Sequence, residues 1–396
     1  MIPSFTFLVA HPNPANHFVE YAQIFEEQEI PYQIIAEEKV AAKFSHLGSR
    51  LRVIDSSQLN EEIFLEKLVS SVHDKSMIIM DISSELWLKF YERLDFRKSE
   101  LEKCVYYDNG ETVVLGGYSK MASKVIPLAQ VILFANASLT QKSLEEEPGV
   151  PIDLSNKEKF GIGYYPIEEV QRVLQIRESG QAENIRHCLF ERYGIEDTGQ
   201  KVFVYAGGAN TEYYQRAFPH FIGLMKELLD NRESSLENSV FILQQHPRAR
   251  EDGNLDEKEM LKIRKGIESG AFSSSFHFIV SDLSTVQCLS IAHGVFYHQT
   301  SMAAQFALAR IPVVAQVSHE VYSDILIKSG FPFIENSQEL SQILLKEDDI
   351  EEVSIQRVRD NLGMDLAWKE NVIELVNRYL FRQQHLEGKE VEKANF

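Results

Sequence analysis

The stretch from residue 276 to residue 317 constrains the fold most strongly, because short apolar runs alternate there with helical patterns. The apolar runs are rich in β-branched or aromatic residues, as strands buried on both faces of a sheet are, and they span 276–280, 294–298 and 311–315. The segments between them predict helices over 284–292 and 301–309. Strand, helix, strand, helix, strand is the order of a parallel, doubly wound sheet. The stretch therefore predicts an α/β fold.

The same alternation runs through most of the chain, whose 396 residues suffice for two domains with a core each. In the first part it predicts strands over 5–10, 32–36, 51–54, 76–82, 103–107 and 129–135, the last of which should close the first sheet. Residues 138–165 break the rhythm, and strands resume at 201–206 and 240–244. We therefore expect two Rossmann-like domains over 1–165 and 201–360, a helical linker over 166–200, and a helix over 361–396 that packs back toward the first domain.

The composition limits which partners the protein can bind and in which cellular compartment we expect it. A formal charge of −19 argues against binding to nucleic acid, because no basic stripe stands out that would neutralise phosphates. The three cysteines lie far apart and in no metal-ligand spacing, which is typical of reduced thiols in a cytoplasmic protein. No signal peptide and no apolar run near the ~20 residues of a membrane span is visible. We expect a cytoplasmic protein that meets any lipid-linked substrate peripherally; its oligomeric state is left open.

A polar turn, His298-Gln299-Thr300-Ser301, ends the second strand of the opening stretch. It falls at the carboxyl end of a parallel strand, where doubly wound sheets bind ligands, and it opens a helix whose free N–H groups attract an anion. The turn, the alanine-rich helix after it and the Ile-Pro-Val-Val of 311–314 together resemble the sugar-nucleotide site of GT-B glycosyltransferases. In that superfamily two Rossmann-like domains face a cleft, so the resemblance implies a GT-B-like architecture.

The resemblance also implies which residues of this segment contact the nucleotide-sugar donor: Gln299, Thr300, Ser301 and Gln305. In retaining members and in sugar-nucleotide epimerases, a glutamate near the position of Gln305 holds the donor ribose, and a glycine usually stands where this chain has Arg310. The residues themselves leave a second interpretation open for Thr300 and Ser301, because helix N-caps use the same residue types.

Two earlier turns of the second domain extend this candidate donor site. Gly207, Gly208 and Asn210 follow a strand, and the step from strand to glycine pair to helix resembles the opening of the GT-B donor domain. His246 and Arg248 follow the next strand in a His-Pro step similar to that of capsule-type and teichoic-acid-type transferases. Glycine lets a backbone approach a diphosphate, and arginine suits phosphate. The alternative for the two glycines is a tight turn that binds no ligand, and the alternative for His246 and Arg248 is an ion pair within the loop.

Two turns of the first domain offer candidates for a catalytic base. His11 directly follows the first strand and His17 lies six residues later in the same turn segment, and imidazole titrates near neutral pH. Asp108 and Glu111 follow the strand over 103–107 and could act as the base or bind the acceptor. The alternatives are histidines bonded in a turn or capping a helix, and a polar turn that needs only its Asn-Gly geometry.

These features together predict glycosyl transfer from a nucleotide-sugar to a hydroxyl-bearing acceptor. We expect no cofactor and no metal, because no Asp-x-Asp stands in a convincing turn and GT-B enzymes generally stabilise the leaving diphosphate with helix dipoles and cationic side chains. Two alternatives stay open. One is a sugar-nucleotide epimerase or hydrolase on the same fold, and the other is an inactive GT-B-like protein that only binds a nucleotide, a glycan or a protein partner.

Overall fold

The computed structural model describes residues 4–10, 12–55, 60–72, 76–81, 85–97, 101–107, 116–134, 153–163, 166–208, 211–231, 236, 239–245, 276–281, 283–300, 302–346, 350–362 and 367–394. The chain divides into two compact units. Unit 1 comprises 1–110, 114–165 and 363–396, and unit 2 comprises 111–113 and 166–362. No helix among the described residues combines the length and the apolar character needed to cross a membrane.

Unit 1 is built on a parallel sheet in the order β3-β2-β1-β4-β5-β6-β7. Its strands are β1 Phe5–Val9, β2 Tyr32–Glu37, β3 Leu51–Ile54, β4 Met77–Asp81, β5 Glu102–Tyr107, β6 Val131–Phe134 and β7 Glu158–Gly161. All pairings are parallel, with Phe5 opposite Tyr32 on one side and Met77 on the other. The central strands β1 and β4 are buried along their whole length, as their apolar sequences require.

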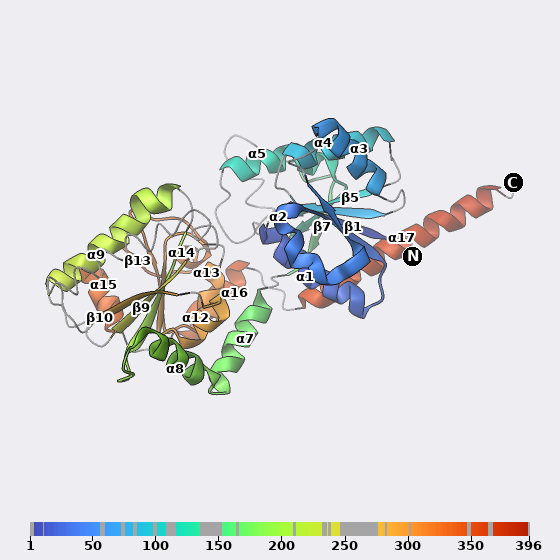
Figure 1. Cartoon of the computed structure of the whole chain (residues 1–396). Coiled ribbons are helices and arrows are strands. Elements are labelled where there is room, and N and C mark those ends of the chain that lie inside the picture. Colours follow the sequence, from blue (N-terminus) through green and yellow to red (C-terminus); the bar gives the residue numbers. More distant parts are fainter. Residues whose placement is uncertain are drawn as a thin grey trace. The chain divides into compact units, whose positions relative to one another are not determined.

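Helices cover both faces of this sheet. On one face lie α3 Glu61–Ser71, α4 Glu85–Arg97 and α5 Gly116–Val125, and on the other α1 Pro12–Glu27 and the C-terminal helix α17 Trp368–Ala394 (Figure 1). Short helical turns complete the unit: α2 Glu38–Ala41, η1 Ala42–Arg50 and η2 Ile126–Leu128. The aromatic rings of α17 hold it in place, with Tyr379 5.1 Å from Phe5 and Trp368 6.0 Å from Tyr21 between ring centroids. The last helix therefore packs within unit 1.

Unit 2 repeats the same architecture with the order β10-β9-β8-β11-β12-β13. Its strands are β8 Lys201–Ala206, β9 Ser239–Gln244, β10 Phe276–Ser281, β11 Gly294–Tyr297, β12 Val313–Val317 and β13 Phe333–Ile334. The helices are α7 Ile167–Glu178, α8 Gln181–Tyr193, the π-helical turn η3 Tyr213–Ala217, α9 Phe218–Asp230, α12 Thr285–Ile291, α13 Ala303–Leu308, α14 Ile325–Lys328, α15 Ser337–Leu344 and α16 Glu352–Leu362. Helices α9 and α15 cover one face, and α7, α8, α12 and α13 cover the other (Figure 1).

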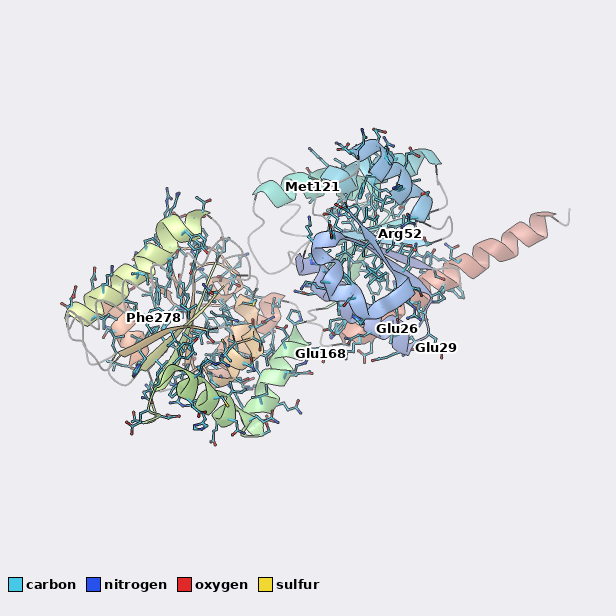
Figure 2. All side chains as sticks on the ribbon, in the orientation of Figure 1. Glu26, Glu29, Arg52, Met121, Glu168 and Phe278 are labelled. Atoms are coloured by element: carbon cyan, nitrogen blue, oxygen red, sulfur yellow. The ribbon has the colours of Figure 1, made fainter. Side chains whose placement is uncertain are left out.

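A row of aromatic rings fixes the strand register on the α9 face. Phe278, Phe241 and Phe203 lie opposite one another on β10, β9 and β8, and neighbouring rings stack at 6.0 and 5.1 Å. Phe278 is labelled among the side chains of this unit in Figure 2. The row ends at Gly294 on β11, where a Cβ atom would stand 2.7 Å from the Phe203 ring. Cross-strand ring pairs of this kind stabilise a sheet in a single register.

The structure confirms the predicted α/β class with two doubly wound parallel sheets. It differs from the predicted elements at three places. The prediction that the strand over 129–135 closes the first sheet is wrong, because β7 follows it at the edge. The third strand of the opening stretch begins at Val313 rather than at residue 311, after Arg310 turns the chain at φ 55° and Pro312 removes a donor. Helix α13 is six residues long, shorter than the predicted 301–309.

The helices of the predicted linker lie within unit 2. Both α7 and α8 pack on α12, and Arg177 of α7 donates hydrogen bonds to carbonyl oxygens of five residues that end α12 and α13. Arg310 keeps a left-handed backbone although it is not glycine, which costs an ordinary residue roughly 1 kcal/mol. The turn before β12 thus has the geometry that a glycine would supply in the pattern predicted from the sequence.

Candidate functional site

Each sheet reverses its strand order once, at a switch point that lies between β1 and β4 in unit 1 and between β8 and β11 in unit 2. In open parallel sheets ligands bind beside such a point, at the carboxyl edge where the strands end. In unit 2 the chain leaves this edge through Gly207 after β8, His298 after β11 and Ser318 after β12. Because β11 and β12 are neighbours, the side chains that follow them meet.

His298 is one of the two buried polar side chains of this group, with Ser318. It is 2% exposed, and its Nδ1 lies 2.7 Å from Ser318 Oγ. Its ring meets the Tyr322 ring edge-on at 4.7 Å between centroids. Its Nε2 is buried and has no hydrogen-bond partner among the residues that the structure describes. Burial lowers the pKa of His298 to about 4, so the imidazole is neutral near neutral pH.

Ser318 also joins His298 to a second histidine and two carboxylates. Ser318 Oγ lies 3.3 Å from His319 Nδ1, and His319 Nε2 lies 3.6 Å from Glu212 Oε1 and 3.8 Å from Glu320 Oε1. The Tyr322 hydroxyl donates to Glu212 and lies 3.0 Å from Glu320 Oε1. Burial and these two carboxylates raise the pKa of the Tyr322 phenol. The arrangement is a continuous polar cluster at the carboxyl edge of unit 2.

The loop that carries this cluster is held by Gln316 of β12. Gln316 Nε2 donates to Tyr322 O and to Asp324 Oδ2, both at 2.9 Å, and its Oε1 accepts from Tyr322 N at 2.8 Å. Asp324 in turn caps α14 by accepting from Ile327 N at 2.9 Å. A buried amide that is satisfied on both sides fixes the path of the backbone, so the cluster stands on rigid support.

Three ligand atoms of the cluster could hold a metal ion. The imidazole of His319 and the carboxylates of Glu212 and Glu320 offer atoms within 4.8 Å of one another. In the described geometry the Tyr322 hydroxyl donates to Glu212 and lies 3.0 Å from Glu320 Oε1, so it stands between the two carboxylates. We therefore assign no metal to this group, and metal independence stays a prediction.

Comparisons with known proteins agree with this architecture. No protein-family model and no curated protein matches the sequence. Among solved structures, UDP-GlcNAc 2-epimerase from Methanocaldococcus jannaschii matches with a TM-score of 0.61 and 12% identity over 94% of this chain and 99% of that one. Trehalose 6-phosphate synthase from Burkholderia multivorans matches with a TM-score of 0.59 and 10% identity over 98% of this chain and 99% of that one. The chain has the GT-B fold.

A third structure of this fold was solved with a sugar nucleotide. The Anabaena protein HepE in complex with UDP-glucose matches with a TM-score of 0.56 and 11% identity, over 94% of this chain and 99% of that one. The coverage means that the similarity to these GT-B proteins includes both units. At such identity the likeness establishes the fold and leaves the reaction to be proposed.

The glycine pair predicted for the donor site of the GT-B fold has a structural explanation in this chain. Gly207 N donates to Gln244 O at 3.0 Å and so extends the sheet by one residue. A Cβ atom on Gly208 would stand 2.8 Å from the ring of Tyr213, which is fully buried. The Gly207 amide is thus part of the sheet, and the absence of a side chain at Gly208 makes room for the ring of Tyr213. A ligand contact by Gly208 stays a prediction.

The described residues of the predicted turn after β11 differ in their surroundings. Thr300 Oγ1 accepts from Met302 N at 3.2 Å, which is a local turn bond and not an N-cap, because Met302 is itself the N-cap residue of α13 and no side chain caps that helix. Gln299 is partly exposed. Gln305 is only 4% exposed, and its Oε1 has no partner among the residues with described positions. Gln245, the residue after β9, likewise has a buried Nε2 without such a partner. Buried polar atoms without partners are rare and call for an explanation.

Several predicted residues lie outside the described part of the chain. In the predicted second domain these are the donor candidates Asn210, His246, Arg248 and Ser301, and in the predicted first domain the base candidates His11, Asp108 and Glu111. Their roles stay predictions.

His17 is described and is buried in unit 1. Its Nδ1 is hydrogen-bonded to the Tyr106 hydroxyl, and burial lowers its pKa to about 3. An imidazole with so low a pKa holds a transferred proton poorly, so this geometry favours the structural interpretation of His17 over the catalytic one.

Two features of the site were missed by sequence reasoning. Asp81 ends β4 at the switch point of unit 1, is fully buried, and accepts from Ala10 N at 3.1 Å. The second feature is the run of Ser318, His319 and Glu320 directly after β12, which belongs to the polar cluster described above. Both could have been flagged by one signal, which is a polar residue directly after a buried apolar strand.

A cavity of about 410 Å³ lies at the opposite, amino-end edge of the second sheet. Its lining includes Arg177, Arg186, Lys201, His293 and Arg310. These side chains have protein partners, as Arg186 binds Asp197 at 2.7 Å and Arg310 binds Glu352 at 2.7 Å. The cavity lies away from the carboxyl edge, so we treat its residues as structural supports of the fold.

Proposed function

We propose that this protein is a sugar-nucleotide-dependent glycosyltransferase. Unit 2 binds the nucleotide-sugar at the carboxyl edge of its sheet, and unit 1 binds an acceptor that bears a hydroxyl group. The observation that carries the proposal is the set of buried polar atoms that have no partner among the described residues, at this edge and on the helix beside it: Gln245 Nε2, His298 Nε2 and Gln305 Oε1. A bound ligand with several hydroxyl and carbonyl groups would satisfy them.

The chemistry follows from what each unit offers. Transfer forms a bond from the acceptor oxygen to the anomeric carbon and breaks the bond to the nucleoside diphosphate. A base of the predicted first domain, for which His11 is the first candidate and Asp108 or Glu111 the next, would take the proton of the acceptor hydroxyl. In unit 2, Ser301, His246 and Arg248 would bind the diphosphate, where a cation offsets its developing charge.

An epimerase or hydrolase acting on the nucleotide-sugar is the second candidate. It is favoured by the similarity to a UDP-GlcNAc 2-epimerase over nearly the full length of both chains. The same donor site would serve either reaction, and only the group that attacks or moves a proton at the sugar would differ. Product analysis separates the candidates, since an isomer, a free sugar and a glycosylated acceptor are distinct compounds.

A thermal-shift panel of nucleoside diphosphates and nucleotide-sugars tests the proposal. A ligand that binds only the folded protein raises its stability with concentration over dissociation constant, so a selective ligand stands out. We expect at least one nucleotide-sugar to raise the melting temperature and its turnover to follow. If no member of the panel stabilises the protein at millimolar concentration, the proposed function is wrong.

A further inference from the structure

We define the histidine relay as Glu212, His319, Ser318 and His298. The carboxylate at one end of the relay determines which atoms along it donate hydrogen bonds and which accept them. The charged atoms near His319 Nε2 are carboxylate oxygens of Glu212 and Glu320, at 3.6 and 3.8 Å. These distances are too long for hydrogen bonds, and Nε2 has no hydrogen-bond partner among the described residues, but the negative charge beside it favours a proton on this nitrogen over one on Nδ1. A neutral His319 therefore keeps its proton on Nε2 and has a bare Nδ1.

The remaining hydrogens of the relay follow from this end. The bare Nδ1 of His319 accepts from the Ser318 hydroxyl, 3.3 Å away. Ser318 Oγ has then used its hydrogen, so the 2.7 Å contact to His298 must be donated by His298 Nδ1. A neutral imidazole carries one proton, and this proton now lies on Nδ1. His298 Nε2 is left as a bare acceptor.

The position of this acceptor decides what it can bind. His298 directly follows β11 beside the switch point of unit 2, and its Nε2 is buried without a partner among the described residues. A buried acceptor that lacks a donor costs roughly 1–3 kcal/mol. Phosphate oxygens of a bound diphosphate are acceptors too and would not satisfy it. A hydroxyl group would.

We propose that His298 Nε2 is a hydrogen-bond acceptor for a hydroxyl group of the ligand, and that Ser318, His319 and Glu212 act as positioning residues that fix its tautomer. The choice of ligand rests on the proposed function, whereas the tautomer does not. The assignment makes His298 a specificity-determining residue. It recognises a ribose or sugar hydroxyl and leaves the phosphates to other groups.

The tautomer can be measured without any ligand. Long-range ¹H–¹⁵N correlation spectra of the full chain with labelled histidine, recorded at pH 8, distinguish a protonated from a bare ring nitrogen. We expect His298 to carry its proton on Nδ1. His293 is an internal control, because its Nε2 lies 3.2 Å from Lys346 O and must donate to that carbonyl. Loss of signals in His298→Ala and His293→Ala assigns the two residues.

Ser318→Ala removes the link between the two histidines and should release the preference of His298 for Nδ1, while His293 keeps its state. A spectrum in which His298 carries its proton on Nε2 in the wild-type protein would overturn the proposal. So would a Ser318→Ala variant, folded by the criterion of an unchanged His293 signal, whose His298 tautomer is the same as in the wild type.

Binding then tests the choice of ligand group. For a nucleotide-sugar that binds the wild-type protein, His298→Ala should weaken affinity roughly tenfold, the equivalent of ~1.4 kcal/mol. Affinity for inorganic pyrophosphate, which has no such hydroxyl groups, should stay unchanged. An equal loss for both probes would show that His298 binds phosphate and would overturn the assignment. If no nucleotide-sugar binds the wild-type protein, the proposed function fails with it, and the spectrum alone still decides the tautomer.

Discussion

At the scale of single residues, a substitution at Gly208 tests whether packing explains the glycine at this position. A Cβ atom there would stand 2.8 Å from the ring of Tyr213, so Gly208→Ala should lower the free energy of unfolding by about 1–3 kcal/mol. Gly223 within α9 is the matched control, because nothing lies within 4 Å of its Cβ position. Gly223→Ala should raise stability by roughly 0.5–1 kcal/mol. Urea unfolding measures both. Equal stabilities would show that the Tyr213 contact does not explain Gly208.

His17 carries a prediction of pH dependence at the same scale. Burial lowers its pKa from 6.5 to about 3 in the folded protein, so between these values the unfolded chain binds a proton that the folded one does not. Stability should therefore fall as the pH drops through this window, by at most ~1.4 kcal/mol per pH unit from this residue. His17→Asn, which can keep a bond to Tyr106, should flatten that slope in urea unfolding from pH 6.5 to 4. An unchanged slope contradicts the assignment.

At the scale of elements, Arg177 joins α7 to the ends of α12 and α13. Its guanidinium donates to Leu289 O at 2.7 Å and to Ala309 O at 3.0 Å, among five such carbonyls. Arg177→Gln should destabilise the protein by at least about 2 kcal/mol, because several carbonyls lose their donor at once. Arg172→Gln on the exposed side of the same helix should change stability by less than about 0.5 kcal/mol. A comparable melting temperature for both variants would refute this role.

The elements also show what the sequence could and could not predict. Strands such as β4 and β12 are buried along their whole length, so their apolar runs made them recognisable. The edge strand β7 has the sequence Glu-Lys-Phe-Gly and one buried position, so no apolar run marked it. The donor turns were predictable because parallel strands end at one edge. The contact between His298 and Ser318 was not, because it joins residues 20 apart whose adjacency depends on β11 pairing with β12.

At the scale of the whole molecule, the account assigns donor binding to unit 2 and the base to unit 1. This division predicts that activity does not depend on a metal, because the proposal rests on cationic side chains at the diphosphate. Turnover should therefore survive an excess of EDTA. A complete loss that Mn²⁺ or Mg²⁺ restores would contradict this prediction, and Glu212, His319 and Glu320 would then be the first ligands to test.

The measurement that tests the central claim most directly is a calorimetric titration of the stabilising nucleotide-sugar into three proteins: the wild type, a Ser301→Ala/His246→Ala variant of unit 2, and a His11→Ala variant of unit 1. The account predicts one site in the wild type, affinity at least roughly tenfold weaker in the unit 2 variant, and unchanged affinity in His11→Ala. His11→Ala should instead lose roughly 10²–10⁴-fold in turnover. Wild-type affinity in the unit 2 variant, or lost affinity in His11→Ala, would contradict the account.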